Sequence, residues 1–148
     1  MKPKGQNMEN KEIRIASNAK DIIAIEENIE KSILSKNVIM SDIENNSTTY
    51  AVYYIDEAPI GYLAYSYCVD HIDIISVAVI PKFRHKKIAT SLINYLFNKY
   101  NNIKIFLEVR KSNSPAISLY ESLNFKCIST RKNYYSYPTE DALIYIKE

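Results

Sequence analysis

The segment between residues 75 and 90 has the residue types needed to hold an anion. An apolar, β-branched run ending in Val79 and Ile80 is followed by the basic loop Lys82–Lys87 and then by residues that start a helix. A loop that opens a helix offers unpaired backbone N–H groups and the positive end of the helix dipole. Four Lys/Arg side chains in the loop add positive charge, which suits a phosphate or pyrophosphate. A charge run is also an ordinary solvated surface loop, and both interpretations stay open.

A second candidate is the carboxylate of Glu108, near the end of the alternating run Ile103–Val109. Alternation places its side chain on the face opposite Leu107 and Val109. A carboxylate there could take a proton from an α-amino group, whose reference pKa is near 8. It could equally be a surface carboxylate that pairs with Arg110 or Lys104.

A third candidate is the phenol of Tyr120, on the apolar stripe of a helix expected to begin with a Ser114 cap and Pro115. On such a stripe tyrosine is an ordinary core residue. A phenol can also return a proton to a departing thiolate, since thiols have a pKa near 8.5. Asn113, just before the helix, is either a loop or capping residue or a ligand contact.

The loop Arg84–Ala89 resembles the acetyl-CoA signature of the GNAT superfamily, in which Gln/Arg-x-x-Gly-x-Gly/Ala follows a strand at the start of a helix. Arg84 and Ala89 match, and Lys87 stands where the family has its first glycine. Glycine lets the backbone approach the phosphates, and lysine is compatible with this role if its backbone is helical and its side chain points outward. The resemblance implies acetyl-CoA as co-substrate, with the backbone of one strand holding the pantetheine arm and the loop holding the pyrophosphate. The residues so implied are Val77, Ala78, Val79, Arg84, His85, Lys86, Lys87, Ile88, Ala89 and Thr90.

The stretch 107–125 resembles the bacterial ribosomal-protein-alanine N-acetyltransferase branch of that superfamily, as do 131–135 and 140–142. The resemblance is carried by Leu-Glu-Val-Arg at 107–110, Asn113 and Ala-Ile-x-Leu-Tyr-Glu-Ser-Leu-x-Phe at 116–125. It implies an acceptor that is the N-terminal α-amino group of a protein, typically beginning Ala-Arg-Tyr. It also implies roles for individual residues: Glu108 as general base, Tyr120 as general acid, Asn113 as a coenzyme contact, and Tyr134 and Tyr135 as walls of the substrate groove.

Two other functions stay open. The first half of the chain has no motif matching this branch, so the acceptor could be a small amine or another protein N-terminus. The lysine in the loop also allows a non-catalytic module that binds coenzyme A and serves regulation.

The sequence pattern predicts that a mixed α/β arrangement of helices and strands positions these residues. The resemblance implies the GNAT fold, with a central mixed, mostly antiparallel sheet flanked by about four helices. Apolar residues on both faces of 71–80 predict a central strand covered on both sides, and Asn124 is a plausible left-handed helix stop. The expected strands are 12–16, 49–55, 60–68, 71–80, 103–109, 125–131 and 142–146; the expected helices are 18–31, a short one within 32–48, 87–100 and one from 114.

The composition of the chain limits its class, its partners and its location. The chain has 148 residues, 47% of them apolar, and a net charge of only +2, which argues against bulk binding of nucleic acid or membrane. We expect a flexible tail at 1–11, a single domain at 12–148 and a cytoplasmic location, since the polar N-terminus is no signal peptide. The sequence does not indicate an oligomeric state. No metal site is expected, because Cys68 and Cys127 lack metal-type spacing and His71 and His85 form no cluster.

Overall fold

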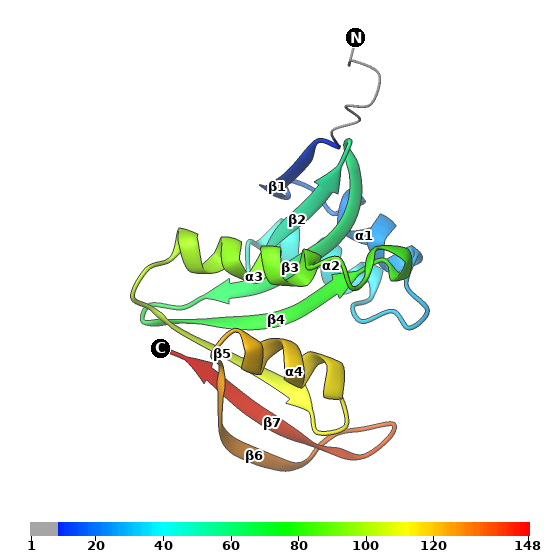
Figure 1. Cartoon of the computed structure of the whole chain (residues 1–148). Coiled ribbons are helices and arrows are strands. Elements are labelled where there is room, and N and C mark those ends of the chain that lie inside the picture. The colour runs from blue at the N-terminus through cyan, green and yellow to red at the C-terminus, as the bar shows by residue number, and fades with distance from the viewer. Residues whose placement is uncertain (1–8) are drawn as a thin grey trace.

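The computed structural model describes residues 9–148, and these form one seven-stranded sheet with the order β1-β2-β3-β4-β5-β7-β6 (Figure 1). Every neighbouring pair is antiparallel except β4 and β5, which are parallel. The expected fold class and element order are therefore confirmed. The strands are β1 (Lys11–Ile15), β2 (Thr49–Ile55), β3 (Ala58–Tyr67), β4 (His71–Val79), β5 (Lys104–Arg110), β6 (Lys126–Tyr135) and β7 (Glu140–Lys147); the helices are α1 (Lys20–Glu27), α2 (Lys36–Asn45), α3 (Ile88–Lys99) and α4 (Ser114–Ser122), with a 3-10 turn η1 (Pro81–Phe83).

Some boundaries differ from expectation. The tail expected at 1–11 lies mostly outside the described residues, and Lys11 already pairs with Ile55 as the first residue of β1. Helix α1 ends at Glu27 instead of continuing to residue 31. The ambiguous stretch 32–48 contains α2, whose start is fixed by the Ser35 hydroxyl accepting from the backbone N–H of Val38 at 3.2 Å.

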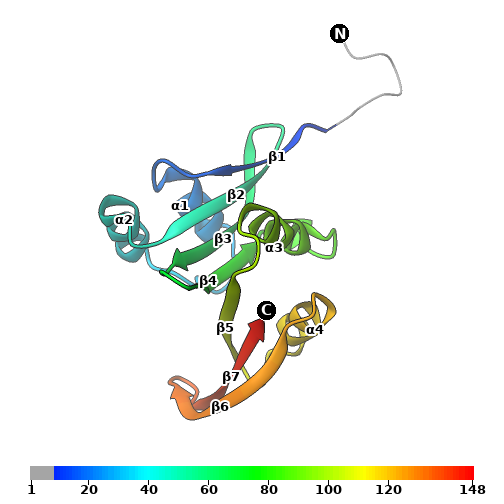
Figure 2. The same ribbon diagram turned by 90° about the vertical axis from the view of Figure 1, so that its left-hand side faces the viewer.

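The helices cover the two faces of the sheet unequally (Figure 2). One core lies between the sheet and helices α3 and α4, and includes residues of β3, β4, β5 and β7. The second core lies under α1 and α2, and its buried strand residues come from β2, β3 and β4 alone. The face of β5 and β7 opposite α4 is thus left without a helix among the described residues. That open face is where a cleft forms.

A buried carboxylate holds the connection between α1 and α2 against this second core. Glu26 is 6% exposed, and its oxygens accept hydrogen bonds from the Tyr62 hydroxyl at 2.5 Å, the Ser32 hydroxyl at 2.7 Å and the Ile33 backbone N–H at 2.8 Å. A buried charge is tolerated when it is this fully hydrogen-bonded. The segment after α1 is therefore fixed to the sheet by side-chain chemistry.

The expectation that β4 is covered on both faces holds for only part of the strand. Ala64 pairs with Ser76 and Tyr65 pairs with Ile74, so Ile75 is an extra residue in a β-bulge. The bulge turns the residues after it toward the other face, and it leaves the Ile75 side chain 49% exposed. The sequence pattern did not reveal this, because isoleucine is equally typical of a covered position.

Strands β4 and β5 pair over only four residues. Their register runs from His71 opposite Lys104 to Ile74 opposite Leu107, whereas β4 continues to Val79 and β5 to Arg110. Beyond this point the two strands separate, as Figure 1 shows. The separation leaves one backbone edge of the end of β4 without a strand partner, and it opens the sheet at its centre.

No helix among residues 9–148 is both long enough and apolar enough to cross a lipid bilayer.

Candidate active site

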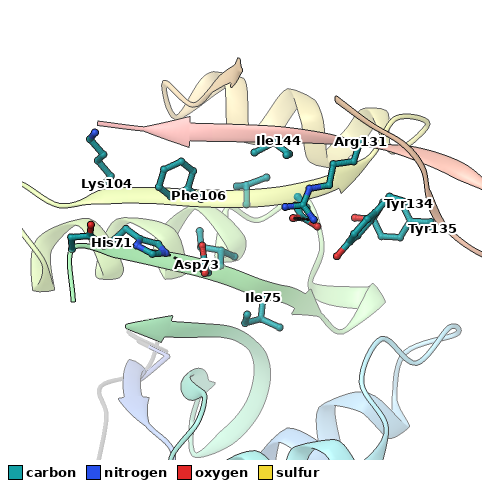
Figure 3. Close-up of a pocket in the computed structure, with 13 residues that line it drawn as sticks. His71, Asp73, Ile75, Lys104, Phe106, Arg131, Tyr134, Tyr135 and Ile144 are labelled. Atoms are coloured by element: carbon teal, nitrogen blue, oxygen red, sulfur yellow. Dashed lines mark hydrogen bonds and ion pairs between the residues drawn. The ribbon is translucent and has the colours of Figure 1, made fainter. Parts of the chain in front are cut away.

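An open cleft of about 790 Å³ lies on the helix-free face of β4, β5 and β7 (Figure 3). Glu108 lines it, while Leu107 and Val109 are buried against the α4 side, as alternation predicted. The cleft brings together residues from four segments of the chain. Its lining residues are Asp70, His71, Asp73, Ile74, Ile75, Lys104, Phe106, Leu107, Glu108, Arg131, Tyr134, Tyr135 and Ile144.

The carboxylate of Glu108 has a charged and a phenolic neighbour, both from β6. Its Oε1 lies 3.7 Å from Arg131 Nη1. Hydrogen bonding to Glu108, together with its negative charge, raises the pKa of the Tyr134 phenol. The hypothetical surface pairs with Arg110 or Lys104 are absent among the described residues. The carboxylate is thus held at the cleft wall with one face toward the open space.

Arg110 instead fixes the loop between β6 and β7 at the edge of the cleft. Its guanidinium donates to the backbone carbonyls of Pro138 at 3.1 Å and Ser136 at 3.2 Å, and to Glu140 Oε2 at 3.2 Å. It also lies 4.4 Å from the centre of the Tyr135 ring, in cation–π geometry. These contacts set the position of Tyr135, which packs edge to face on Tyr134 with ring centres 5.1 Å apart.

Tyr120 lies on the other side of the sheet, in the core beneath α4. Its ring packs edge to face on Phe125 at 5.7 Å, and the residue is only 9% exposed. Burial, with a smaller contribution from the Tyr135 phenol, raises the pKa of Tyr120 to about 12. Its hydroxyl has no hydrogen-bond partner among residues 9–148. No fully buried side-chain oxygen or nitrogen of these residues lacks a partner, so the Tyr120 hydroxyl oxygen keeps some accessible surface. A neutral phenol that still reaches accessible space can donate a proton.

A second pocket, of about 390 Å³, lies at the start of α3. It brings together Val79 of β4 and most of the basic loop that the sequence singled out. The first hydrogen bond of α3 joins the Ser91 N–H to the Lys87 carbonyl at 3.0 Å, so the three preceding N–H groups have no helical acceptor. The lining residues are Val79, Phe83, Arg84, His85, Lys87, Ile88, Ala89, Thr90 and Leu119.

Lys87 does not have the helical backbone expected of it. Its φ of 61° and ψ of 25° lie in the left-handed region, as does His85 with φ 63°. This is the conformation that glycine adopts without cost, and for lysine it costs about 1–2 kcal/mol. The loop therefore keeps the backbone shape of a glycine-containing loop although it carries a side chain.

Arg84 serves mainly to hold the loop in place. Its Nε donates to the carbonyl of Val79 at 3.1 Å, and its Nη2 lies 3.5 Å from Glu30 Oε2. The guanidinium therefore ties the loop to the end of β4 and to the segment after α1.

The other residues implied as coenzyme contacts, Val77, Ala78, Lys86 and Asn113, do not line this pocket. Val77 and Ala78 lie on the part of β4 that has separated from β5. Asn113, and not Ser114, is the N-cap of α4, since its Oδ1 accepts from the N–H of Ala116 at 3.3 Å. The left-handed stop expected at Asn124 is present, with φ 70°.

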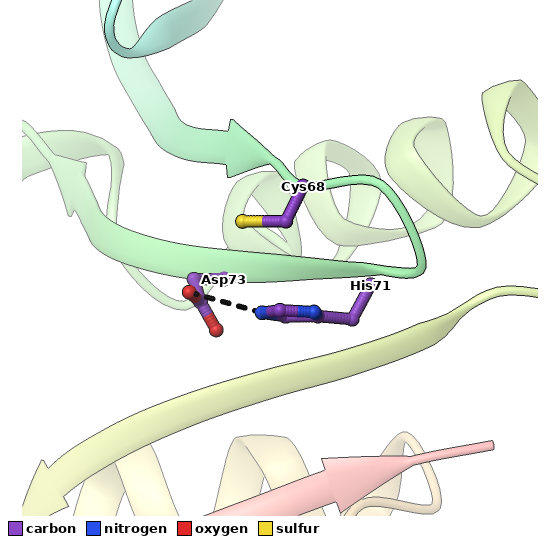
Figure 4. Close-up of side chains that lie close together, drawn as sticks. All are labelled: Cys68, His71 and Asp73. Carbon is purple, nitrogen blue, oxygen red and sulfur yellow. Dashed lines mark ion pairs between the residues drawn. The ribbon is translucent and has the colours of Figure 1, made fainter.

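Sequence reasoning missed the far end of the cleft. Asp70, His71, Asp73 and Phe106 all line it, and the alternation of β4 and β5 was the signal that could have placed the last three on one face. The conclusion that the histidines form no cluster was wrong for His71. Its ligand atom lies within 4.8 Å of those of Cys68 and Asp73 (Figure 4).

Curated relatives match about half of the chain. An N-alpha-acetyltransferase of Saccharolobus solfataricus is 47% identical over 75 residues, which cover 48% of this chain and 44% of that protein. A [Ribosomal protein bS18]-alanine N-acetyltransferase of Salmonella typhimurium is 37% identical over 83 residues, which cover 51% of this chain and 55% of that protein. The chain thus spans about half the length of the curated relatives it matches.

Solved structures match nearly the whole fold. The ribosomal-protein-S18-alanine N-acetyltransferase of Escherichia coli has a TM-score of 0.80 at 24% identity, covering 94% of this chain and 92% of that chain. Arabidopsis thaliana NAA60, solved in complex with acetyl-CoA, has a TM-score of 0.79 at 17% identity, covering 93% of this chain and 98% of that chain. At these identities the likeness establishes the fold.

The profile of the family described as Acetyltransferase (GNAT) family matches residues 17–125, which include the basic loop, Glu108 and Tyr120. This match extends over most of the chain. The chain belongs to the GNAT acetyltransferase family.

Proposed function

We propose that the protein transfers the acetyl group of acetyl-CoA to the N-terminal amino group of a protein. The observation that carries this proposal is the arrangement of two sites about the split in the sheet. A pocket rich in free N–H groups opens at the start of α3, and a cleft containing Glu108 opens on the opposite face. Strand β4, which separates from β5 after Ile74, contributes residues to both.

The residues at the first pocket fit the phosphates of acetyl-CoA. The N–H groups of Ile88, Ala89 and Thr90 are free of helical acceptors, and a helix start attracts anions. Arg84 and Lys87 line the same pocket, so positive charge is available there. The edge of 77–79 on β4, which has no strand partner among the described residues, would pair with the amide groups of the pantetheine arm, as backbone edges do with extended chains.

The residues about the gap fit a direct transfer. Glu108 takes a proton from the protonated amine, and the neutral nitrogen then attacks the thioester carbonyl. A C–N bond forms, the C–S bond breaks, and Tyr120 gives its proton to the departing thiolate. The nitrogen loses its second proton to solvent as the amide forms, and Tyr120 and Glu108 return to their starting states by exchanging protons with solvent. Because burial raises the pKa of Tyr120 to about 12, the phenol carries its proton at neutral pH. A free N–H of β4 near Val77 would stabilise the oxyanion.

The shape of the cleft supports a protein N-terminus as acceptor. The cleft is open and is walled by Tyr134 and Tyr135, whose rings can flank a peptide backbone. By name, one of the curated relatives is an N-alpha-acetyltransferase and the other acetylates an alanine of a ribosomal protein. We therefore propose a ribosomal-protein-type N-terminus beginning with alanine as the first acceptor to test, with a small amine as the alternative.

The test is incubation of the purified protein with acetyl-CoA and a peptide beginning Ala-Arg-Tyr. Release of free thiol is followed, and mass spectrometry locates the added acetyl group. We expect acetylation at the α-amine in the wild type, and almost none in Glu108→Gln or with a peptide already blocked at its N-terminus.

Other outcomes would change the proposal. Acetyl-CoA binding with no product from this peptide, but product from peptides with other first residues or from small amines, would keep the reaction and replace the acceptor. Binding with no turnover on any amine would favour the non-catalytic coenzyme-binding module.

A further inference from the structure

The turn between β3 and β4 brings three different ligating side chains to one place. Cys68 directly follows β3, and its backbone N–H donates to the His71 carbonyl at 2.8 Å, which closes the turn. His71 and Asp73 are two residues apart in β4, so both project on the same face. A thiol, an imidazole and a carboxylate, each half-buried, thus have ligand atoms that all lie within 4.8 Å of one another (Figure 4).

The imidazole is oriented as in metal sites. His71 Nδ1 lies 2.7 Å from Asp70 Oδ1, while Nε2 faces Asp73 Oδ2 at 3.5 Å. A histidine that ligates a metal characteristically donates its other ring N–H to a carboxylate, which directs the free lone pair at the ion. Two ligands of a tetrahedral ion with bonds of about 2.0–2.1 Å lie about 3.3 Å apart. The spacing of Nε2 and Oδ2 is close to that value.

We propose that Cys68, His71 and Asp73 bind a zinc ion, with Asp70 supporting the histidine. A thiolate and an imidazole favour zinc over magnesium or calcium, which prefer oxygen ligands. Only a small closure of the 4.8 Å cluster brings the three ligand atoms to tetrahedral spacing around one ion. Because His71 and Asp73 also line the cleft, the fourth coordination position lies at the cleft's far end and takes a water.

The site lies at the opposite end of the cleft from Glu108. His71 is opposite Lys104 and Asp73 is opposite Phe106. Glu108 is thus four and two residues further along β5, about 13 and 7 Å at the rise of a strand. An ion at this point clamps the ends of β3 and β4 and shapes the end of the cleft. The inference does not rest on the proposed function.

The test uses the full chain stripped of metal and titrated with cobalt(II), which gives a sulfur-to-metal absorption band when a thiolate binds. We expect saturation at one cobalt per chain, displacement by zinc, and loss of the band in Cys68→Ser. Cys127→Ser is the matched control, because Cys127 is also a free cysteine but is exposed on β6; its band should remain. Asp70→Asn should weaken binding by about 10–100-fold, as supporting carboxylates do.

Zinc should also raise the melting temperature of the wild type and of Cys127→Ser but not of Cys68→Ser, since a ligand stabilises only a state that binds it. Circular dichroism of each metal-free variant checks folding, and His71→Gln replaces Cys68→Ser if that variant fails to fold. The proposal is overturned if binding does not saturate, if the band survives in Cys68→Ser, or if it is lost in Cys127→Ser. The cluster would then be an ion pair of His71 with two aspartates.

Discussion

The pocket at the start of α3 and the cleft around Glu108 are made of different chemical groups. The pocket depends on backbone N–H groups of 88–90 and on a left-handed residue before them. The cleft depends on side chains that converge from β4, β5 and β6. The pocket therefore keeps its backbone shape when a lysine stands in the place of a glycine. A substitution in the cleft is expected to change its chemistry directly, because the reacting groups there are side chains.

The largest effect expected from this difference is that of Glu108→Gln. The change keeps the shape of the side chain but removes its ability to accept a proton, so turnover should fall by about 100- to 10,000-fold. The dissociation constant for acetyl-CoA should change little, because the pocket lies on the other face. Steady-state kinetics and calorimetry measure the two quantities. Glu57→Gln, an exposed carboxylate at the turn between β2 and β3, is the control, and equal turnover in both variants would remove Glu108 from the mechanism.

Tyr120→Phe should have the next largest effect, slowing turnover by about 100-fold. The ring packing on Phe125 is kept, so the melting temperature should stay close to that of the wild type. The neutral phenol is the donor, and a pKa of about 12 keeps it neutral as pH rises. The ratio of mutant to wild-type rate should therefore be constant from about pH 6 to 9. A wild-type rate in the mutant would make Tyr120 a core residue only.

Tyr134→Phe should act on the acceptor alone and by less. Removing the hydroxyl leaves the ring packed edge to face on Tyr135 but takes away its interaction with Glu108. We expect KM for the peptide to rise by about two- to tenfold, the value of a single modest hydrogen bond, with the acetyl-CoA affinity unchanged. An equal change in both affinities would show that the cleft and the pocket are not independent.

Lys87→Gly should have the smallest effect and tests the pocket. Relief of the left-handed strain is opposed by the greater freedom of unfolded glycine, so the protein should gain at most about 1 kcal/mol of stability. Affinity for acetyl-CoA should fall less than about tenfold, the worth of one exposed charge. Lys87→Ala removes the charge but keeps the strain, which separates the two effects. A hundredfold loss of affinity would mean that the pocket, like the cleft, depends on side chains.

Sequence alone determined the local features of this protein. Periodicity and turn residues gave the order of helices and strands, because each element must present one apolar face to a core. The same alternation placed Glu108 opposite the buried Leu107 and Val109. The basic loop at a helix start identified the pocket, since a helix's free N–H groups follow from the helix itself.

Tertiary structure decided what depends on pairing between distant segments. The pairing of β4 and β5 ends at Ile74 and Leu107. The residue pattern within either strand does not indicate where this pairing ends. Arg131 reaches Glu108 only because β6 folds back beside β7. The left-handed Lys87 is also a product of context, because the rest of the loop holds a conformation that lysine by itself avoids. The periodicity of each helix or strand is a property of its own sequence, whereas the contacts between distant segments depend on how the whole chain packs.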